Sequence, residues 1–262
     1  MPPIADSHLH LDDARFDGDR DEVVARARRA GVAAFVAPGI DAAGWPRLRA
    51  LCHATPGAYP AYGLHPLFVA RHRPGHLDEL RRLLADARPV ALGEIGLDFH
   101  REDAQADTQR HYFHRQLELA REFDLPVIVH ARDALEEVIH TVRRIGGLRG
   151  VVHSFSGSEQ QARQLWELGF MLGIGGPVTY ERAQRLRRIV AAMPVEHLLL
   201  ESDAPDQPGA DHRGQRNEPA WVADTLRCVA GLRGETEAAL AAATMANLRR
   251  LFGIDIARLA PR

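Results

Sequence analysis

The feature that most constrains the fold is a regular alternation of short apolar runs with longer amphipathic runs. The apolar runs are typical of buried strands and cover residues 4–8, 33–37, 58–64, 90–94, 126–130, 150–154, 170–174 and 197–201. The intervening runs repeat apolar residues at helical spacing, as in 19–30, 107–123 and 134–145. Strands that alternate with helices pair in parallel, and eight such units in about 250 residues fit a closed barrel. The sequence therefore predicts an α/β protein with a (β/α)8 TIM barrel, in which residues 1–262 form one domain.

The C-terminal part of the chain extends this pattern. Residues 219–253 predict two more helices that close the barrel. Residues 204–218 are polar and rich in proline and glycine, and they follow the eighth apolar run. Because catalytic residues of TIM barrels lie where the strands end, we expect this segment to be a loop over the catalytic face.

Side chains that can bind a metal stand at the ends of five predicted strands. Residues 6–10 read Asp-Ser-His-Leu-His, and strand alternation would point His8 and His10 the same way. Such a pair near a terminus could equally be two surface histidines, but similar residues recur at later strand ends, namely Glu94, His130, His153 and Asp203. Parallel strands end at one rim of a barrel, so we expect these six side chains to converge on a metal site. Asp6 and Asp98 are expected to orient imidazoles.

The ligand types favour two divalent ions. We expect one ion on His8, His10 and Asp203, and the other on His130 and His153, with Glu94 bridging the two. Mixed nitrogen and oxygen donors suit Zn²⁺, Mn²⁺ or Mg²⁺. The chain has no lysine, so the bridge must be a carboxylate of Glu or Asp, and Schiff-base chemistry is excluded. A metal pair of this kind activates water for hydrolysis at a phosphoryl or acyl centre, with Asp203 placed to accept the proton of the water.

Three further residues are candidates for contact with the substrate. His65 follows the third strand and could polarise or protonate a substrate oxygen without binding metal, although it could also be an ordinary loop histidine. Arg132 comes two residues after His130 and is suited to a bidentate grip on phosphate, with a helix-capping salt bridge as the alternative. Arg216, in the loop after the eighth strand, could act in the same way.

Composition limits the class of partner and the compartment. The formal net charge is −2 and 45% of the residues are hydrophobic, which argues against a basic nucleic-acid-binding arm. A nucleic-acid substrate stays possible because metal ions neutralise phosphate locally. The two cysteines, Cys52 and Cys228, fall in helix-like runs, so we expect no disulfides and a cytoplasmic location. Because the first motif begins at residue 6, we expect no signal peptide, and no apolar run approaches the roughly 20 residues of a membrane span.

Six short motifs follow one another along the chain between residue 4 and residue 252. They are Asp6-Ser7-His8-Leu9-His10-Leu11-Asp12, Gly63-Leu64-His65-Pro66, Gly93-Glu94-Ile95-Gly96-Leu97-Asp98, Leu125-Pro126-Val127-Ile128-Val129-His130-Ala131-Arg132, Val152-His153-Ser154-Phe155-Ser156-Gly157 and Leu200-Glu201-Ser202-Asp203-Ala204-Pro205. In these residues the chain resembles the TatD family of metal-dependent hydrolases, also called TatD-type deoxyribonucleases. Residues 203–208 and 215–219 look most like its bacterial uncharacterised-hydrolase branch.

The resemblance implies a TIM barrel, two or three divalent metals and phosphodiester hydrolysis of DNA. The family's ligands fall on the six residues already selected, which are His8, His10, Glu94, His130, His153 and Asp203. One departure touches the substrate loop, because Asp206 replaces the aromatic residue that often follows Asp-Ala-Pro.

Three functions are compatible with these observations. The first is a deoxyribonuclease or phosphodiesterase, and the second is a hydrolase of another ester, such as a misacylated tRNA or a small metabolite. The third is a binding protein that has kept the barrel without catalysis. The complete set of six ligands argues against the third function, whereas a net charge near zero does not separate the first two.

Overall fold

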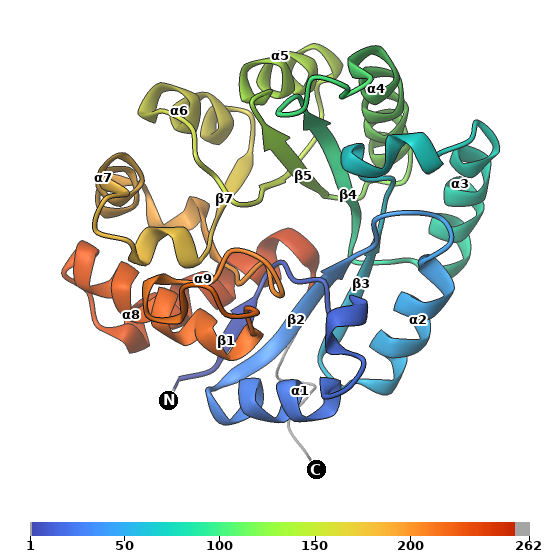
Figure 1. Cartoon of the computed structure of the whole chain (residues 1–262). Helices are drawn as coiled ribbons and strands as arrows, with labels where there is room; N and C mark the ends of the chain where they lie inside the picture. The colour runs from blue at the N-terminus through green and yellow to red at the C-terminus, as the bar shows by residue number, and fades with distance from the viewer. Residues whose placement is uncertain (1, 255–262) are drawn as a thin grey trace.

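The computed structural model describes residues 2–254, and its eight strands pair in sequence order as one parallel sheet that curves into a barrel (Figure 1). The strands are β1 (Ile4–Asp6), β2 (Val32–Pro38), β3 (Ala58–Tyr62), β4 (Ala91–Asp98), β5 (Val127–Arg132), β6 (Gly150–Val152), β7 (Phe170–Ile174) and β8 (Leu198–Leu200). This is the predicted (β/α)8 TIM barrel. Of the predicted single domain, residue 1 and residues 255–262 lie outside the described residues.

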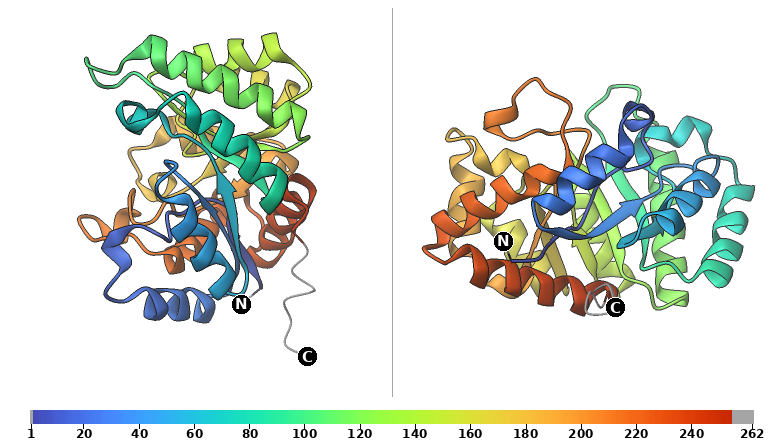
Figure 2. Two further views of the ribbon diagram at one scale, coloured as in Figure 1. Left: turned by 90° about the vertical axis from the view of Figure 1, so that its right-hand side faces the viewer. Right: turned by 90° about the horizontal axis from the view of Figure 1, so that it is seen from below.

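Helices surround the strands, as Figure 1 and the turned views in Figure 2 show. They are α1 (Arg20–Arg29), α2 (Trp45–Ala54), α3 (Gly75–Ala87), α4 (Ala106–Glu122), α5 (Leu135–Ile145), α6 (Glu159–Glu167), α7 (Gln184–Ala192), α8 (Val222–Arg233) and α9 (Glu237–Phe252). The larger hydrophobic core lies between the strands and this outer layer. Among residues 2–254, no helix has both the length and the apolar character that crossing a membrane requires.

The last helix closes one end of the barrel. The barrel interior is filled by small and branched side chains such as Ala5, Ala34 and Val36, and these pack against Leu248 and Phe252 of α9. The prediction of two closing helices is therefore correct for α9, whereas α8 packs beside α7 in the outer layer. With this end filled, the loops that follow the carboxyl ends of the strands form the accessible end.

Hydrogen bonds join the segments that follow β1 and β8. The Ser7 amide donates to Leu200 O at 3.0 Å, and the Asp203 amide donates to His8 O at 2.9 Å. The buried Asp6 carboxylate accepts hydrogen bonds from the Ser202 amide at 2.9 Å and from the Ser202 hydroxyl. The expectation that Asp6 orients an imidazole is therefore wrong, because its oxygens are bonded across this seam instead. The seam fixes the position of His8 relative to Asp203.

Several predicted strand ends are displaced in the structure, and two of these differences bear on the site. β4 does not end at Glu94 but continues to Asp98, because its register against β5 shifts between Leu92 and Ile95 and pairing then resumes. β1 ends at Asp6, so the two histidines that follow lie in a loop rather than on the face of a strand. The metal-binding side chains therefore come together because of the conformation of the loop after β1 and the irregular pairing of β4.

The close approach of β4 to β5 gives a test of the fold. Gly96 has a φ of +143°, and a Cβ built on it would lie 2.0 Å from His130 O. We expect Gly96→Ala to lower the free energy of unfolding by about 3–5 kcal/mol, because backbone rather than a flexible side chain must move. Gly231→Ala, in α8 with no atom within 4 Å, is the matched control and should be neutral or slightly stabilising. Urea unfolding followed by circular dichroism measures both; equal midpoints for the two variants would contradict the prediction.

Candidate metal centre

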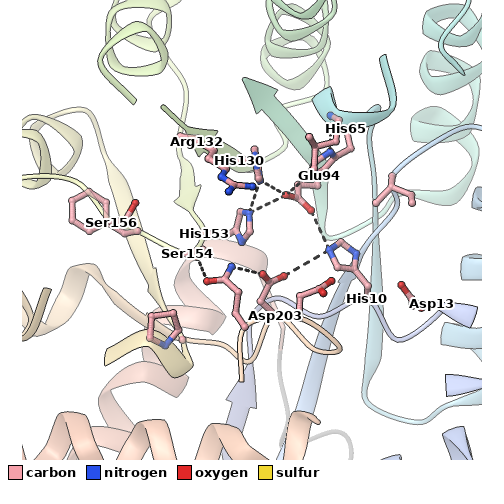
Figure 3. A pocket seen from close by; sticks show the side chains of 18 of the residues that line it. His10, Asp13, His65, Glu94, His130, Arg132, His153, Ser154, Ser156 and Asp203 are labelled. Carbon is pink, nitrogen blue, oxygen red and sulfur yellow. Dashed lines mark hydrogen bonds and ion pairs between the residues drawn. The ribbon is translucent and has the colours of Figure 1, made fainter. Parts of the chain in front are cut away.

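A cavity of about 1340 Å³ opens among the loops at the carboxyl ends of the strands. Glu94, His130 and His153 line it together with His10 and Asp203, and Figure 3 shows their side chains pointing toward one another. The six residues predicted as metal ligands are therefore brought together, because His8 also lies against Glu94.

Glu94 occupies the centre of this group, and its two carboxylate oxygens face different neighbours. Oε2 lies 3.2 Å from His8 Nε2 and 3.4 Å from His10 Nε2. Oε1 lies 3.1 Å from His130 Nδ1 and 2.9 Å from His153 Nε2. The carboxylate thus separates two sets of donor atoms, which is the arrangement expected of a bridging ligand.

Asp203 completes the set around Oε2 of Glu94. Its Oδ1 lies 3.5 Å from His8 Nε2 and 3.7 Å from His10 Nε2. Four donors at about 2.1 Å from one ion, at tetrahedral angles, lie about 3.4 Å from each other. The four separations of His8 and His10 from the two carboxylates match that spacing, and the ligand atoms of His8, His10 and Glu94 all lie close to one another, so the residues present fit a divalent ion.

Protonation and hydrogen bonding support the same conclusion. Burial lowers the pKa of His8 well below its usual value, so the ring is neutral near pH 7. Burial would raise the pKa of Glu94, but His65, His153 and His8 outweigh it and hold the pKa well below its usual value. His8 Nε2 and Glu94 Oε2 are both buried and neither has a hydrogen-bond partner. A neutral imidazole and a carboxylate that face each other in this way are suited to share a cation.

Buried carboxylates support two of the imidazoles. Asp98 Oδ2 lies 2.9 Å from His130 Nε2, which supports the predicted orienting role of Asp98. Glu201 Oε1 lies 3.7 Å from His153 Nδ1, too far for a hydrogen bond, so that contact is electrostatic. Sequence reasoning missed Glu201, although its place two residues before Asp203 at the end of a predicted strand was a usable signal.

His65 lies closer to the centre than the sequence indicated. The Leu67 amide donates to His65 Nδ1 at 3.1 Å, so the proton of the neutral ring lies on Nε2. Nε2 is 2.9 Å from Glu94 Oε1, and His65, Glu94 and His130 form one of the groups whose ligand atoms are mutually close. Burial lowers the pKa of His65 to about 4, which keeps the ring neutral near pH 7.

Asp203 is held from its far side by the loop after β8. Gln207 Nε2 donates to Asp203 Oδ2 at 2.6 Å, and Ser154 Oγ donates to Gln207 Oε1 at 2.9 Å. Oδ1 is thereby left facing the histidines, as Figure 3 shows. Burial raises the pKa of Asp203 to about 6. Sequence reasoning missed Gln207, because its contact depends on how an irregular loop folds back over the barrel.

The two predicted substrate arginines lie in different places. Arg132 lines the cavity beside His130 (Figure 3), and it is exposed. Arg216 does not line the cavity: its guanidinium pairs with Asp19 at 2.6 Å and Glu218 at 3.2 Å and lies 4.8 Å from the centre of the Phe16 ring. The ion pairs of Arg216 tie the loop after β8 to the segment that begins α1 and hold its guanidinium away from the cavity.

Comparison with known proteins places this centre in a family. The model of TatD related DNases matches residues 5–253. The chain is 38% identical to the uncharacterised metal-dependent hydrolase YjjV of Escherichia coli over 252 residues, which cover 95% of this chain and 97% of that one. It is 39% identical to a protein of Cronobacter sakazakii named 3'-5' ssDNA/RNA exonuclease TatD, covering 94% and 97% of the two chains.

A solved structure supports the assignment. The crystal structure of YjjV, a TatD homologue from Escherichia coli, superposes with a TM-score of 0.92 at 37% identity, covering 96% of this chain and 98% of that one. The family that the sequence motifs indicated is therefore confirmed by both kinds of comparison. The chain belongs to the TatD-related DNase family of metal-dependent hydrolases.

Proposed function

We propose that this protein is a phosphodiesterase, most specifically a deoxyribonuclease, that uses two divalent ions such as Zn²⁺, Mg²⁺ or Mn²⁺. The observation that carries the proposal is the placement of the Glu94 oxygens, which face two separate sets of donor atoms. The name of the Cronobacter sakazakii relative, an exonuclease for single-stranded DNA and RNA, supports nucleic acid as the substrate. The free cysteines Cys52 and Cys228 support a cytoplasmic location.

Six side chains would hold the ions. His8, His10 and Asp203 would bind one, His130 and His153 the other, and Glu94 would contact both. When bound, two such ions lower the pKa of a water molecule toward about 7 and balance the negative charge that develops on a phosphoryl group.

Other atoms of the same chain would carry out the proton transfers and hold the substrate. Asp203 Oδ1 faces the centre and is placed to take the proton of the attacking water. His65 carries the single proton of its neutral ring on Nε2, directed at the centre, and from there can donate a hydrogen bond that polarises a substrate oxygen. Arg132, exposed at the cavity wall beside His130, can grip the scissile phosphate with two parallel N–H groups.

Removal of metal is the direct test. We expect treatment with a chelator to abolish hydrolysis, and addition of Mg²⁺, Mn²⁺ or Zn²⁺ to restore it, because the donor set is built from carboxylates and imidazoles. Metal content is measured by atomic emission alongside turnover. Full activity in a preparation shown to be metal-free would refute the proposal.

Substrate class is tested by comparing three substrates with the metal-loaded enzyme. These are a single-stranded oligodeoxynucleotide, a generic phosphodiester and an aminoacyl ester. The proposal expects the highest kcat/KM for the oligonucleotide and the lowest for the aminoacyl ester. A preference for the aminoacyl ester would assign the chain to the alternative class, which includes hydrolases of misacylated tRNA and small-metabolite esters.

A further inference from the structure

The two sides of the cavity differ in how their arginines are paired. On the side formed by the segments after β1 to β3, all three lining arginines are in ion pairs with carboxylates. Arg15 pairs with Asp13 at 2.9 Å and with Asp206 at 2.8 Å. The remaining pairs are Arg47 with Asp17 and Arg71 with Asp41. The positive charge of this side is therefore largely compensated within the protein.

The opposite side, formed by the segments after β5 to β7, carries arginines that are not paired with carboxylates. Its lining residues include Arg132, Arg182 and Arg185, and within residues 130–186 no aspartate or glutamate lines the cavity. In the described part of the chain none of these three arginines forms an ion pair. All three are exposed, so their guanidinium groups are available to a ligand.

Neutral partners hold two of these arginines in place. Arg185 Nη2 donates to Ser156 O at 2.8 Å, which fixes its guanidinium above the loop that follows β6. The Arg182 guanidinium lies 5.3 Å from the centre of the Tyr180 ring. A backbone carbonyl and an aromatic ring restrict the motion of the two side chains without removing their charge. Both arginines therefore present preorganised positive groups to the cavity.

We propose that Arg182 and Arg185 form a second phosphate subsite, which binds a backbone phosphate next to the scissile one. The inference rests on the proposed function, in which Arg132 and the ion-binding residues hold the scissile phosphate. A nucleic-acid strand that crosses the cavity would leave it over the segments after β6 and β7, where the lining arginines are not paired with carboxylates. Contacts to phosphate carry no base preference, so the subsite favours a single strand of several nucleotides over a small ester regardless of sequence.

The test compares a double variant with a control substitution at a nearby arginine of α7. Arg182→Gln/Arg185→Gln removes both charges, while Arg188→Gln removes one exposed arginine of α7 that does not line the cavity. Binding of a fluorescein-labelled 12-nucleotide oligothymidylate is followed by fluorescence anisotropy in low salt with chelator present, so that no strand is cut. Because all three positions are exposed, we expect every variant to fold, and circular dichroism checks this.

We expect the double variant to bind the oligonucleotide about tenfold more weakly than the control, because two charge-assisted contacts are lost. The slope of log K against log salt should fall in magnitude by about 0.7, because one phosphate of the single strand is no longer neutralised. A labelled dinucleotide, which has one internal phosphate, should bind both variants equally. An uncharged methylphosphonate strand of the same length should also fail to distinguish the variants.

Equal affinity of the double variant and the Arg188→Gln control for the 12-nucleotide strand would overturn the subsite. This result is separable from failure of the proposed reaction, because binding is measured without cleavage. A wild-type protein that binds the strand through these arginines yet leaves it intact when loaded with metal would retain the subsite and lose the nuclease function. If the metal-loaded wild-type protein cleaves the strand but the double variant binds it as tightly as the control, the nuclease function is retained and the subsite is refuted.

Discussion

Replacing Glu94 with alanine is expected to reduce both metal content and turnover more than the loss of any one surrounding imidazole. The side chain is 1% exposed, and its two oxygens face His8 and His10 on one side and His130 and His153 on the other. Removing it takes one donor from each proposed ion and also removes the negative charge between them. The chain has no lysine that could supply a substitute bridge.

We expect Glu94→Ala to bind fewer than two ions per chain and to lose at least about 100-fold in turnover. Mutation of a residue that only orients a metal ligand already costs up to about 100-fold, and loss of a ligand itself should cost at least as much. The comparison is with His10→Ala, which removes a peripheral donor and leaves the carboxylate in place. Metal content by atomic emission and turnover on an oligonucleotide are measured together, with circular dichroism to confirm folding. Two ions retained with near-normal turnover would show that Glu94 does not bridge.

The convergence of the predicted ligands illustrates what a sequence can reveal about such a barrel. Parallel strands bring their carboxyl ends to one rim, so residues at those ends meet even when the strand boundaries are displaced. Glu94 lies inside β4 rather than at its end, and His8 and His10 lie beyond the end of β1. All three nevertheless reach the centre, because an error of a few residues along a strand does not change which rim the chain approaches.

Contacts between irregular segments could not be predicted in this way. Arg216 was expected at the substrate, but its partner Asp19 stands 197 residues away in the chain. Gln207 reaches Asp203 only because the loop after β8 folds back across the barrel. Such contacts depend on loop conformation and on competing ion pairs, for which hydrophobic periodicity provides no information. His65 was predicted only in part: the sequence places it after the third strand, but it does not reveal the hydrogen bond to Glu94.

Replacing Asp203 with asparagine is expected to separate binding of metal from transfer of the proton. The substitution keeps the size of the side chain and one coordinating oxygen, but the amide cannot accept the proton of the attacking water. Oδ1 lies 3.5 Å from His8 Nε2, while Oδ2 accepts a hydrogen bond from Gln207. With Gln207 fixing one oxygen, the other is directed at the place where water would attack.

We expect Asp203→Asn to fold, to keep at least part of its metal and to lose about 10²–10⁴-fold in turnover, the range for removal of a general base. Asp206→Asn is the matched control, because Asp206 lines the same cavity from the same loop but pairs with Arg15 at its edge. If Asp203 were only a ligand, excess metal would restore much of the rate. Turnover is therefore measured at saturating metal, where a near wild-type rate for Asp203→Asn would exclude it as the base and leave the metal centre intact.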